Sequence, residues 1–242
     1  MPVSELDRDL RSIQEARDLA SRAFEAWKLW STASQEQVDR VCAAMSAAAI
    51  SASERLGLHA YQETGYGIPE HKHLKNVFAA KNVWESIKDL KSVGIVGHDP
   101  QKRIYDIAWP VGVIAALTPS TNPTSTVMFK ILIAVKARDA IVIAPHPSAA
   151  KCCYETTRVM AQAAQENGAP PGLISCMQNI TLQGTQELMQ HKYVALILAT
   201  GGTPMVRAAH STGKPAYGVG PGNVPVYRDR PAALEKAARY IL

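Results

Sequence analysis

The chain has 242 residues, of which 47% are hydrophobic, and its formal net charge is +5 at pH 7. This length can bury a large core and form one large or two modest domains. Lys and Arg are interspersed with acidic residues, and no uninterrupted apolar stretch is long enough to span a bilayer. The N-terminus is charged and lacks the apolar core of a signal peptide. The composition therefore predicts a soluble, cytoplasmic protein that binds neither nucleic acid nor membranes.

The spacing of the cysteines and histidines does not indicate a metal site. No Cys-x-x-Cys pair is present, and His71 and His73, two residues apart, point to different sides of a helix. We expect the cysteines to be reduced and to pack as small hydrophobic side chains: Cys42, Cys152, Cys153 and Cys176. Since Cys152 and Cys153 are adjacent in a predicted helix, we expect at most one of them to face the core.

The part of the chain before Gly94 is predicted to be helical. In residues 4–30 apolar side chains recur at intervals of three and four, which places them on one stripe: Leu6, Leu10, Ile13, Ala16, Ala20, Phe24 and Trp27. Such a helix either packs on the protein's own core or serves as an address for a protein shell or partner, and the absence of a linker favours packing. Residues 34–37 form a capping box that starts a second helix reaching toward Leu56, and Pro69 starts a third.

Two β-rich segments, 93–96 and 103–109, flank a turn at His98-Asp99-Pro100 and predict a hairpin. The composition changes here from helical and charged to β-branched and apolar. We therefore predict a domain boundary at this point. Residues 1–109 would form the N-terminal helices and hairpin, and residues 110–242 a second domain.

Apolar strands alternate with helices from Val111 onward. The predicted strands are 111–117, 140–144, 173–177 and 193–199, followed by the less regular segments 216–219 and 224–227. The predicted helices are 123–136, 148–167, 182–191 and 203–211. This alternation predicts an α/β fold with a Rossmann-like parallel sheet covered by helices on both faces. A last helix is predicted over 231–242; it has no C-cap, so we expect the chain to be cut within a larger protein.

The stretch Pro110–Pro123 joins a buried strand to a helix N-terminus, which is where α/β proteins usually bind ligands. Gly112 is expected within the strand, and the loop 118–121 contains no glycine. The G-x-G-x-x-G pattern of a common dinucleotide site is therefore absent. Either a cofactor binds here in another way, or the likeness to a Rossmann fold is architectural only.

Four motifs occur in the same order as in one enzyme family. They are TPSTNPTST at 118–126, APHP at 144–147, ATGG at 199–202 and GVGPGN at 218–223. Together they resemble the CoA-acylating aldehyde dehydrogenases, including the aldehyde half of bifunctional aldehyde–alcohol dehydrogenases. The resemblance implies a cofactor domain, a catalytic domain and an oligomerisation hairpin, and hence a homo-oligomer. It also implies a reaction in which a Cys attacks a short aldehyde, hydride passes to NAD or NADP, and coenzyme A takes the acyl group.

The resemblance also implies the site residues. Asn122 matches the family's oxyanion-hole Asn, whose amide donates to the developing alkoxide, whereas by local sequence it would be a plain N-cap. His146 lies where the adenosine ribose is held in the family, and an ordinary loop residue is an equally good interpretation. The glycines serve a ligand or a tight turn equally well. The residues expected at the cofactor are Thr118, Pro119, Thr121, His146, Pro147, Thr200, Gly201, Gly202, Gly218, Val219 and Gly220.

Two absences bear on the chemistry that the resemblance implies. Hydrolytic relatives use a Glu to activate water, but the matching position here is Gly218, and no acid lies between Lys214 and Tyr227. Without this base a thiol is a better acyl acceptor than water, which favours acylation of coenzyme A. The family's nucleophilic Cys would lie beyond Leu242, so we expect the catalytic domain to be absent from this chain. The alternatives are a non-catalytic nucleotide-binding or assembly module and a hydrolytic aldehyde dehydrogenase.

Overall fold

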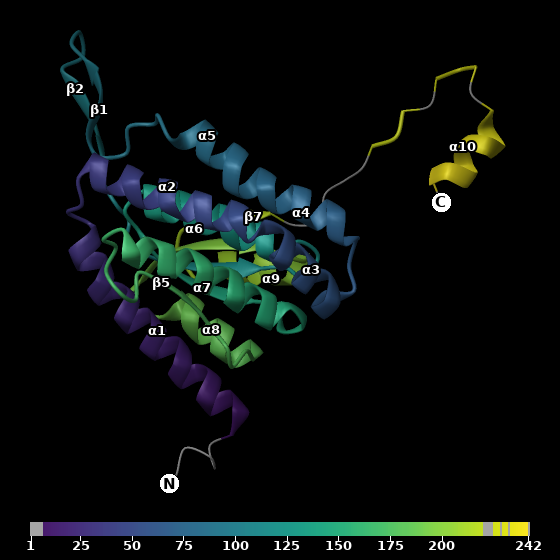
Figure 1. The fold of residues 1–242 in the computed structure, drawn as a ribbon, viewed down its shortest axis with the longest axis horizontal. Coiled ribbons are helices and arrows are strands. Elements are labelled where there is room, and N and C mark those ends of the chain that lie inside the picture. The colour runs from purple at the N-terminus through teal and green to yellow at the C-terminus, as the bar shows by residue number, and fades with distance from the viewer. Residues whose placement is uncertain (1–6, 220–224, 228, 232, 242) are drawn as a thin grey trace.

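A computed structural model describes residues 7–219, 225–227, 229–231 and 233–241 (Figure 1). Its elements follow in this order: α1 Arg8–Trp30, α2 Gln35–Ser51, α3 Ser53–Thr64, α4 Pro69–Val77, a π-helical turn Phe78–Asn82, α5 Val83–Ile87, β1 Gly94–Asp99, β2 Ile104–Ala108, β3 Val113–Thr118, α6 Pro123–Lys136, β4 Ala140–Pro145, a 3₁₀ turn Pro147–Ala149, α7 Ala150–Glu166, β5 Ile174–Cys176, α8 Leu182–Gln190, β6 Val194–Thr200, α9 Thr203–His210, β7 Ala216–Val219 and α10 Leu234–Ile241. In these ranges, none of the helices combines the length and the apolarity that a bilayer span requires.

The predicted α/β fold is confirmed by a five-stranded parallel sheet with the order β5-β4-β3-β6-β7. Every residue of β3 and β4 is buried, because α6 and α7 pack on one face of these strands and α1 packs on the other. This coverage explains their continuous apolar sequences. The helices α8 and α9 contact the β6 side of the sheet.

Gly112 lies just before β3, so the expectation that it lies within the strand is wrong. Its φ of +132° is a conformation that side-chain-bearing residues rarely adopt, and its N–H donates to Oδ1 of Asp139 at 2.8 Å. The glycine therefore turns the chain into the first strand of the sheet.

A second layer of helices covers α6 and α7. The capping box at the start of α2 is confirmed, with Ser34 Oγ accepting from Gln37 N at 3.2 Å and Gln37 Oε1 accepting from Ser34 N at 2.9 Å. The helix does not continue to Leu56, because the chain breaks at Ala52 into α3. The expectation for Cys152 and Cys153 is wrong, since both are fully buried. The reason is that α7 is packed between the sheet on one side and α2 and α3 on the other.

The helix α1 packs on the protein's own sheet and against α8. Its buried face differs at the N-terminal end from the predicted stripe. Leu6 lies outside the described residues, Leu10 is 52% exposed, and the fully buried residue of these turns is Ser12. The apolar contacts begin only at Ala16.

The strands β1 and β2 form the predicted antiparallel hairpin, which projects from the body of the molecule (Figure 1). Its turn comes later than predicted, because His98 and Asp99 still pair with Tyr105 and Ile104. Toward the C-terminus, 225–227 is not a strand and Val224 lies outside the described residues, whereas the last predicted helix is present as α10.

Candidate cofactor site

A cavity of about 250 Å³ lies at the carboxyl ends of β3, β4 and β6. The chain proceeds from β3 toward β4 on one side and returns to β6 on the other, so this is the point where the strand order reverses. Parallel sheets leave a crevice at such a point, because the connections on its two sides run in opposite directions. The cavity is the place where a ligand of this fold is expected.

The cavity brings together most of the residues expected at a cofactor. They come from the ends of three strands: Thr118 and Pro119 after β3, His146 and Pro147 after β4, and Thr200, Gly201 and Gly202 after β6. Of the other expected residues that the structure describes, Thr121, Gly218 and Val219 do not line it. Val219 is next to the rim, where its carbonyl accepts from Gly201 N at 3.3 Å, and Gly220 lies outside the described residues.

A further wall was missed by sequence reasoning. The loop between β5 and α8 and the first turn of α8 line the cavity, together with Met205 of α9: Ile180, Thr181, Leu182 and Thr185. The sequence holds one signal for this wall, because Thr181 directly precedes a predicted helix and Thr is a common N-cap residue. In the structure the Thr181 side chain caps α8 by accepting from Gly184 N at 3.1 Å. In a parallel sheet, the loop after this strand lies at the same edge of the sheet as the loops that follow the other strands.

The N-terminus of α9 opens on this cavity without a side-chain cap. Its N-cap is Gly202, and no side chain of the described residues accepts from the first N–H groups of the helix. Pro204 has no N–H, and Met205 N donates to the carbonyl of Gly202 at 3.0 Å, so Thr203 N is the first donor that the helix offers. A helix N-terminus carries about half a positive charge on unpaired N–H groups, which favours an anion such as a phosphate.

The two glycines at the cavity and the glycine in β7 differ in whether packing requires a residue without a side chain. A Cβ at Gly201 or Gly202 would have only ordinary contacts, at 3.7 Å, and neither residue has a positive φ. The fold therefore does not require glycine at these two positions. At Gly218 a Cβ would lie 2.4 Å from Val206 Cγ1 and 2.9 Å from His210 Nε2. Packing against α9 explains this glycine.

His146 takes part in local structure as well as in the cavity. Its Nδ1 accepts from Ser148 N at 3.2 Å and lies 2.8 Å from Ser148 Oγ, so the ring caps the short 3₁₀ turn. The two interpretations of this residue are compatible, because the ring is exposed at the cavity while Nδ1 is engaged.

Asn122 does not act as a side-chain cap for α6. Its Oδ1 accepts a hydrogen bond from Lys75 Nζ of α4 at 2.9 Å. The preceding residue, Thr121, is held from the same helix, since its carbonyl accepts from Lys72 Nζ at 3.1 Å. The junction between β3 and α6 is thus fixed by two lysines of α4, and neither Thr121 nor Asn122 lines the cavity.

Lys130 of α6 lies beneath the cavity and is 2% exposed. Its Nζ donates to the carbonyl of Leu117 in β3 at 2.6 Å and to the carbonyl of Leu198 in β6 at 2.8 Å. It thereby joins the ends of the two strands that flank the cavity. Burial lowers the pKa of this amine to about 7, since desolvation penalises the charged form.

All four cysteines are buried and unpaired with one another. Burial raises the pKa of the Cys42 thiol to about 12 and raises that of Cys176 further. The pKa of Cys152 is also raised, first by its hydrogen bond with Cys153 and then by burial. A thiol with a raised pKa is a poor nucleophile at neutral pH. The expectation that the cysteines pack as small hydrophobic side chains is confirmed, since all four lie in the core.

The sequence model of the aldehyde dehydrogenase family matches residues 6–221 of this chain. The chain belongs to the aldehyde dehydrogenase family. It is 44% identical over 208 residues to aldehyde-alcohol dehydrogenase 2 of Entamoeba histolytica, with 86% of this chain and 24% of that protein aligned.

Solved structures of this family show the same fold. An acetylating aldehyde dehydrogenase from Geobacillus thermoglucosidasius has a TM-score of 0.91 and 54% identity, with 97% of this chain and 52% of that chain covered. A propionaldehyde dehydrogenase from Rhodopseudomonas palustris, solved with bound CoA and an acylated cysteine, has a TM-score of 0.77 and 30% identity, covering 92% and 51%. The chain thus spans between about a quarter and a half of the length of these relatives.

Proposed function

We propose that this chain is the nicotinamide-cofactor-binding part of a CoA-acylating aldehyde dehydrogenase. The overall reaction would be aldehyde + CoA + NAD(P)⁺ → acyl-CoA + NAD(P)H + H⁺, in which the aldehyde carbon is oxidised and the nicotinamide is reduced. The observation that carries the proposal is the uncapped N-terminus of α9, with Gly201 and Gly202 kept free of side chains beside it. The names of the relatives, which include acetylating aldehyde dehydrogenases, support the acyl chemistry.

The cavity suits the two halves of a dinucleotide in different ways. The pyrophosphate would lie at the N-terminus of α9, where Thr203 N can donate to it and the helix dipole favours a negative charge. The adenosine would lie in the apolar part between α8 and α9, against Leu182 and Met205. Among the described lining residues there is no Asp or Glu, the side chains that commonly select a free ribose 2′-hydroxyl. We therefore propose that the site accepts both NAD⁺ and NADP⁺.

We propose Asn122 as the oxyanion donor and the junction Pro119–Pro123 as one side of the carbonyl site. Loss of one such donor costs roughly a hundredfold to a thousandfold in rate. The nucleophilic Cys would come from the part of the relatives' length that this chain does not span, because its own cysteines are buried. Gly218 supplies no general base, so the thioester would be released by coenzyme A and not by water.

The hairpin supports the proposal that the protein is a homo-oligomer. Ile104, Tyr105 and Ile107 of β2 are each about half exposed or more, which is unusual for apolar side chains on a projecting strand. A second copy of the chain would cover them. Analytical ultracentrifugation should show a dimer or larger assembly that an Ile104→Glu, Ile107→Glu variant converts to monomers. A monomeric wild-type chain would contradict the proposal. A cytoplasmic location stays a prediction.

A second candidate is a nucleotide-binding or assembly module without turnover, which the burial of all four cysteines favours for this polypeptide alone. The test is to mix the purified chain with NAD⁺, CoA and acetaldehyde. We expect NAD⁺ binding by calorimetry without NADH formation. CoA-dependent NADH formation would show that a nucleophile is present in this chain after all, and NADH with free acid in the absence of CoA would identify hydrolytic chemistry.

A further inference from the structure

One wall of the cavity is built from a segment without helix or strand. Residues 177–181 join β5 to α8, and Ile180 and Thr181 of this segment line the cavity beside Leu182. Loops with few backbone partners open easily, and an open wall would have to be ordered each time a ligand binds. What holds this loop is therefore relevant to ligand affinity.

The backbone of this loop is hydrogen-bonded to α1, a helix that precedes the sheet in the chain and connects none of its strands. The two carboxylate oxygens of Glu15 accept from Gln178 N at 2.9 Å and from Asn179 N at 2.7 Å. One turn earlier, Ser12 Oγ accepts from Thr181 N at 3.2 Å. Hydrogen bonds from N–H groups to a carboxylate are about twice as strong as neutral ones. Thus three of the four backbone N–H groups of residues 178–181 donate to two side chains of α1.

These side chains replace the apolar stripe that the sequence predicts for the first turns of α1. Ser12 and Glu15 are three residues apart on one helix face, directly before the buried Ala16. Ser12 is fully buried, and Gly184 of α8 leaves it space, since a Cβ at Gly184 would lie 1.8 Å from Ser12 Oγ. The contact between α1 and the start of α8 is therefore shaped around a polar group.

We propose that Glu15 and Ser12 are positioning residues for the cofactor cavity. They hold the backbone of residues 178–181, so that Ile180 and Thr181 form a preordered wall for the adenosine part of a nicotinamide dinucleotide. The proposal rests on the proposed function, and it assigns a role in cofactor affinity to a helix that precedes the sheet in the chain. A preordered wall improves affinity because less conformational entropy is lost on binding.

The direct test is Glu15→Gln in the whole chain, with the NAD⁺ dissociation constant measured by calorimetry. The amide has the same shape but only one acceptor oxygen, so its NH₂ group opposes one of the two backbone N–H groups. We expect the Kd to rise about tenfold, a change of about 1.4 kcal/mol. Hydrogen exchange at the amides of Gln178 and Asn179 should accelerate in the same variant. Ser12→Ala, which removes only the bond to Thr181, should raise the Kd severalfold.

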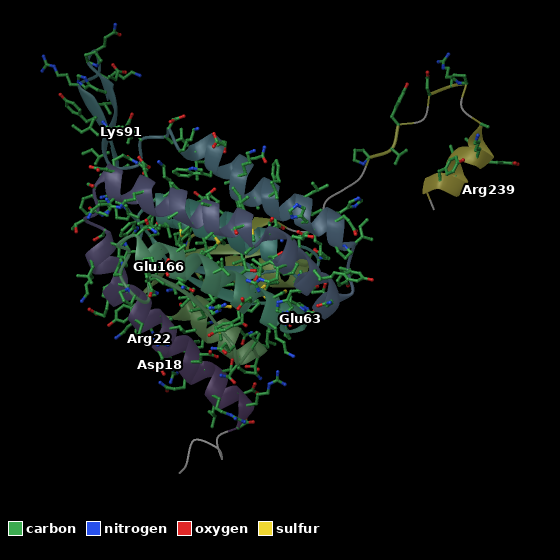
Figure 2. The ribbon with its side chains drawn as sticks, viewed as in Figure 1. Asp18, Arg22, Glu63, Lys91, Glu166 and Arg239 are labelled. Carbon is green, nitrogen blue, oxygen red and sulfur yellow. The ribbon has the colours of Figure 1, made fainter. Side chains whose placement is uncertain are left out.

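A matched control exists at another helix. The carboxylate of Glu63 on α3 accepts from Lys151 N at 2.9 Å and from Cys152 N at 2.7 Å, the same pair of bonds at the start of α7. In Figure 2, Glu166 lies at one end of α7 and Glu63 lies near the other end. Neither Lys151 nor Cys152 lines the cavity. Glu63→Gln should therefore lower the melting temperature as Glu15→Gln does, with a Kd within about twofold of wild type.

The outcomes separate the two proposals. A wild-type chain that binds neither NAD⁺ nor NADP⁺ would overturn the proposed function and the positioning role with it. Binding by the wild type with an unchanged Kd in Glu15→Gln and Ser12→Ala would overturn only the positioning role. An equal rise of the Kd in Glu15→Gln and Glu63→Gln would also overturn it, because the effect would then follow general stability.

Discussion

Lys75 donates a 2.9 Å hydrogen bond to Oδ1 of Asn122, and this bond determines which way the Asn122 amide faces. The ammonium group has donors only, so it must meet the oxygen and not the nitrogen of the amide. Nδ2 of Asn122, which carries the two N–H donors, is consequently not engaged by this lysine. A donor that is oriented before the reaction is what an oxyanion site requires, since reorganisation during the reaction is costly.

Replacing Lys75 with Met should release the Asn122 side chain without unfolding the protein. We expect the NMR order parameter of the Asn122 side-chain amide to fall, because the hydrogen bond that Lys75 donates to this amide is lost. Lys81→Met is the control, since Lys81 is an exposed lysine of the adjoining π-helical turn. An equally ordered Asn122 in both variants would show that other contacts orient it.

The buried amine of Lys130 should make the free energy of unfolding depend on pH in an unusual way. Its pKa is about 7 in the folded protein and 10.5 as the ordinary value, so the unfolded chain binds more protons between these pH values. Stability should therefore rise with pH over this range, by on the order of 4 kcal/mol for this group alone. A neutral amine has two N–H donors, which match the two carbonyls that Lys130 contacts.

The check is urea unfolding of the wild type and of Lys130→Met at a series of pH values from 7 to 10. The difference between the two free energies of unfolding should grow as the pH rises, because other titrating groups contribute equally to both proteins. A constant difference would contradict the assigned pKa. Met also leaves the Leu117 and Leu198 carbonyls without this donor, at about 1–3 kcal/mol each.

The sheet could be predicted from the sequence, but the packing around it could not. Runs of apolar residues such as Val113–Leu117 identify strands that are covered on both faces, and this pattern is local. The burial of both Cys152 and Cys153 depends on α2 and α3, which are distant in sequence. Periodicity within one helix describes its own stripe and gives no information on a second covering layer.

The site was predicted where strand ends carry motifs and missed where the wall comes from an ordinary loop. Thr200, Gly201 and Gly202 follow a strand directly, so the topology alone brings them to the cavity. The contacts of Ser12 could not be predicted, because a helix stripe is defined by its apolar residues and Leu10 fits the predicted stripe. A polar residue is buried there because the loop 178–181 offers N–H groups that need acceptors.

The glycines give a paired prediction on stability. Gly218→Ala should destabilise the protein by about 1–3 kcal/mol, because the added methyl group would overlap Val206 and His210 of α9. Gly201→Ala should change stability by less than about 0.5 kcal/mol, since its Cβ would be in ordinary contact with Met205 only. Chemical denaturation measures both, and similar losses in the two variants would mean that Gly201 is also required by packing.

The claim that this cavity binds a dinucleotide by its phosphates is tested most directly with Gly202→Asp. Gly202 has the extended conformation of an N-cap, and an Asp there can accept from Met205 N, since Pro204 has no N–H. The variant should keep its fold and gain up to about 1 kcal/mol, while its carboxylate occupies the place proposed for the pyrophosphate. In calorimetry with NAD⁺ we predict a Kd at least about thirtyfold above that of wild type, with Gly202→Ala between the two. A Gly202→Asp protein that binds NAD⁺ as tightly as the wild type would contradict the account.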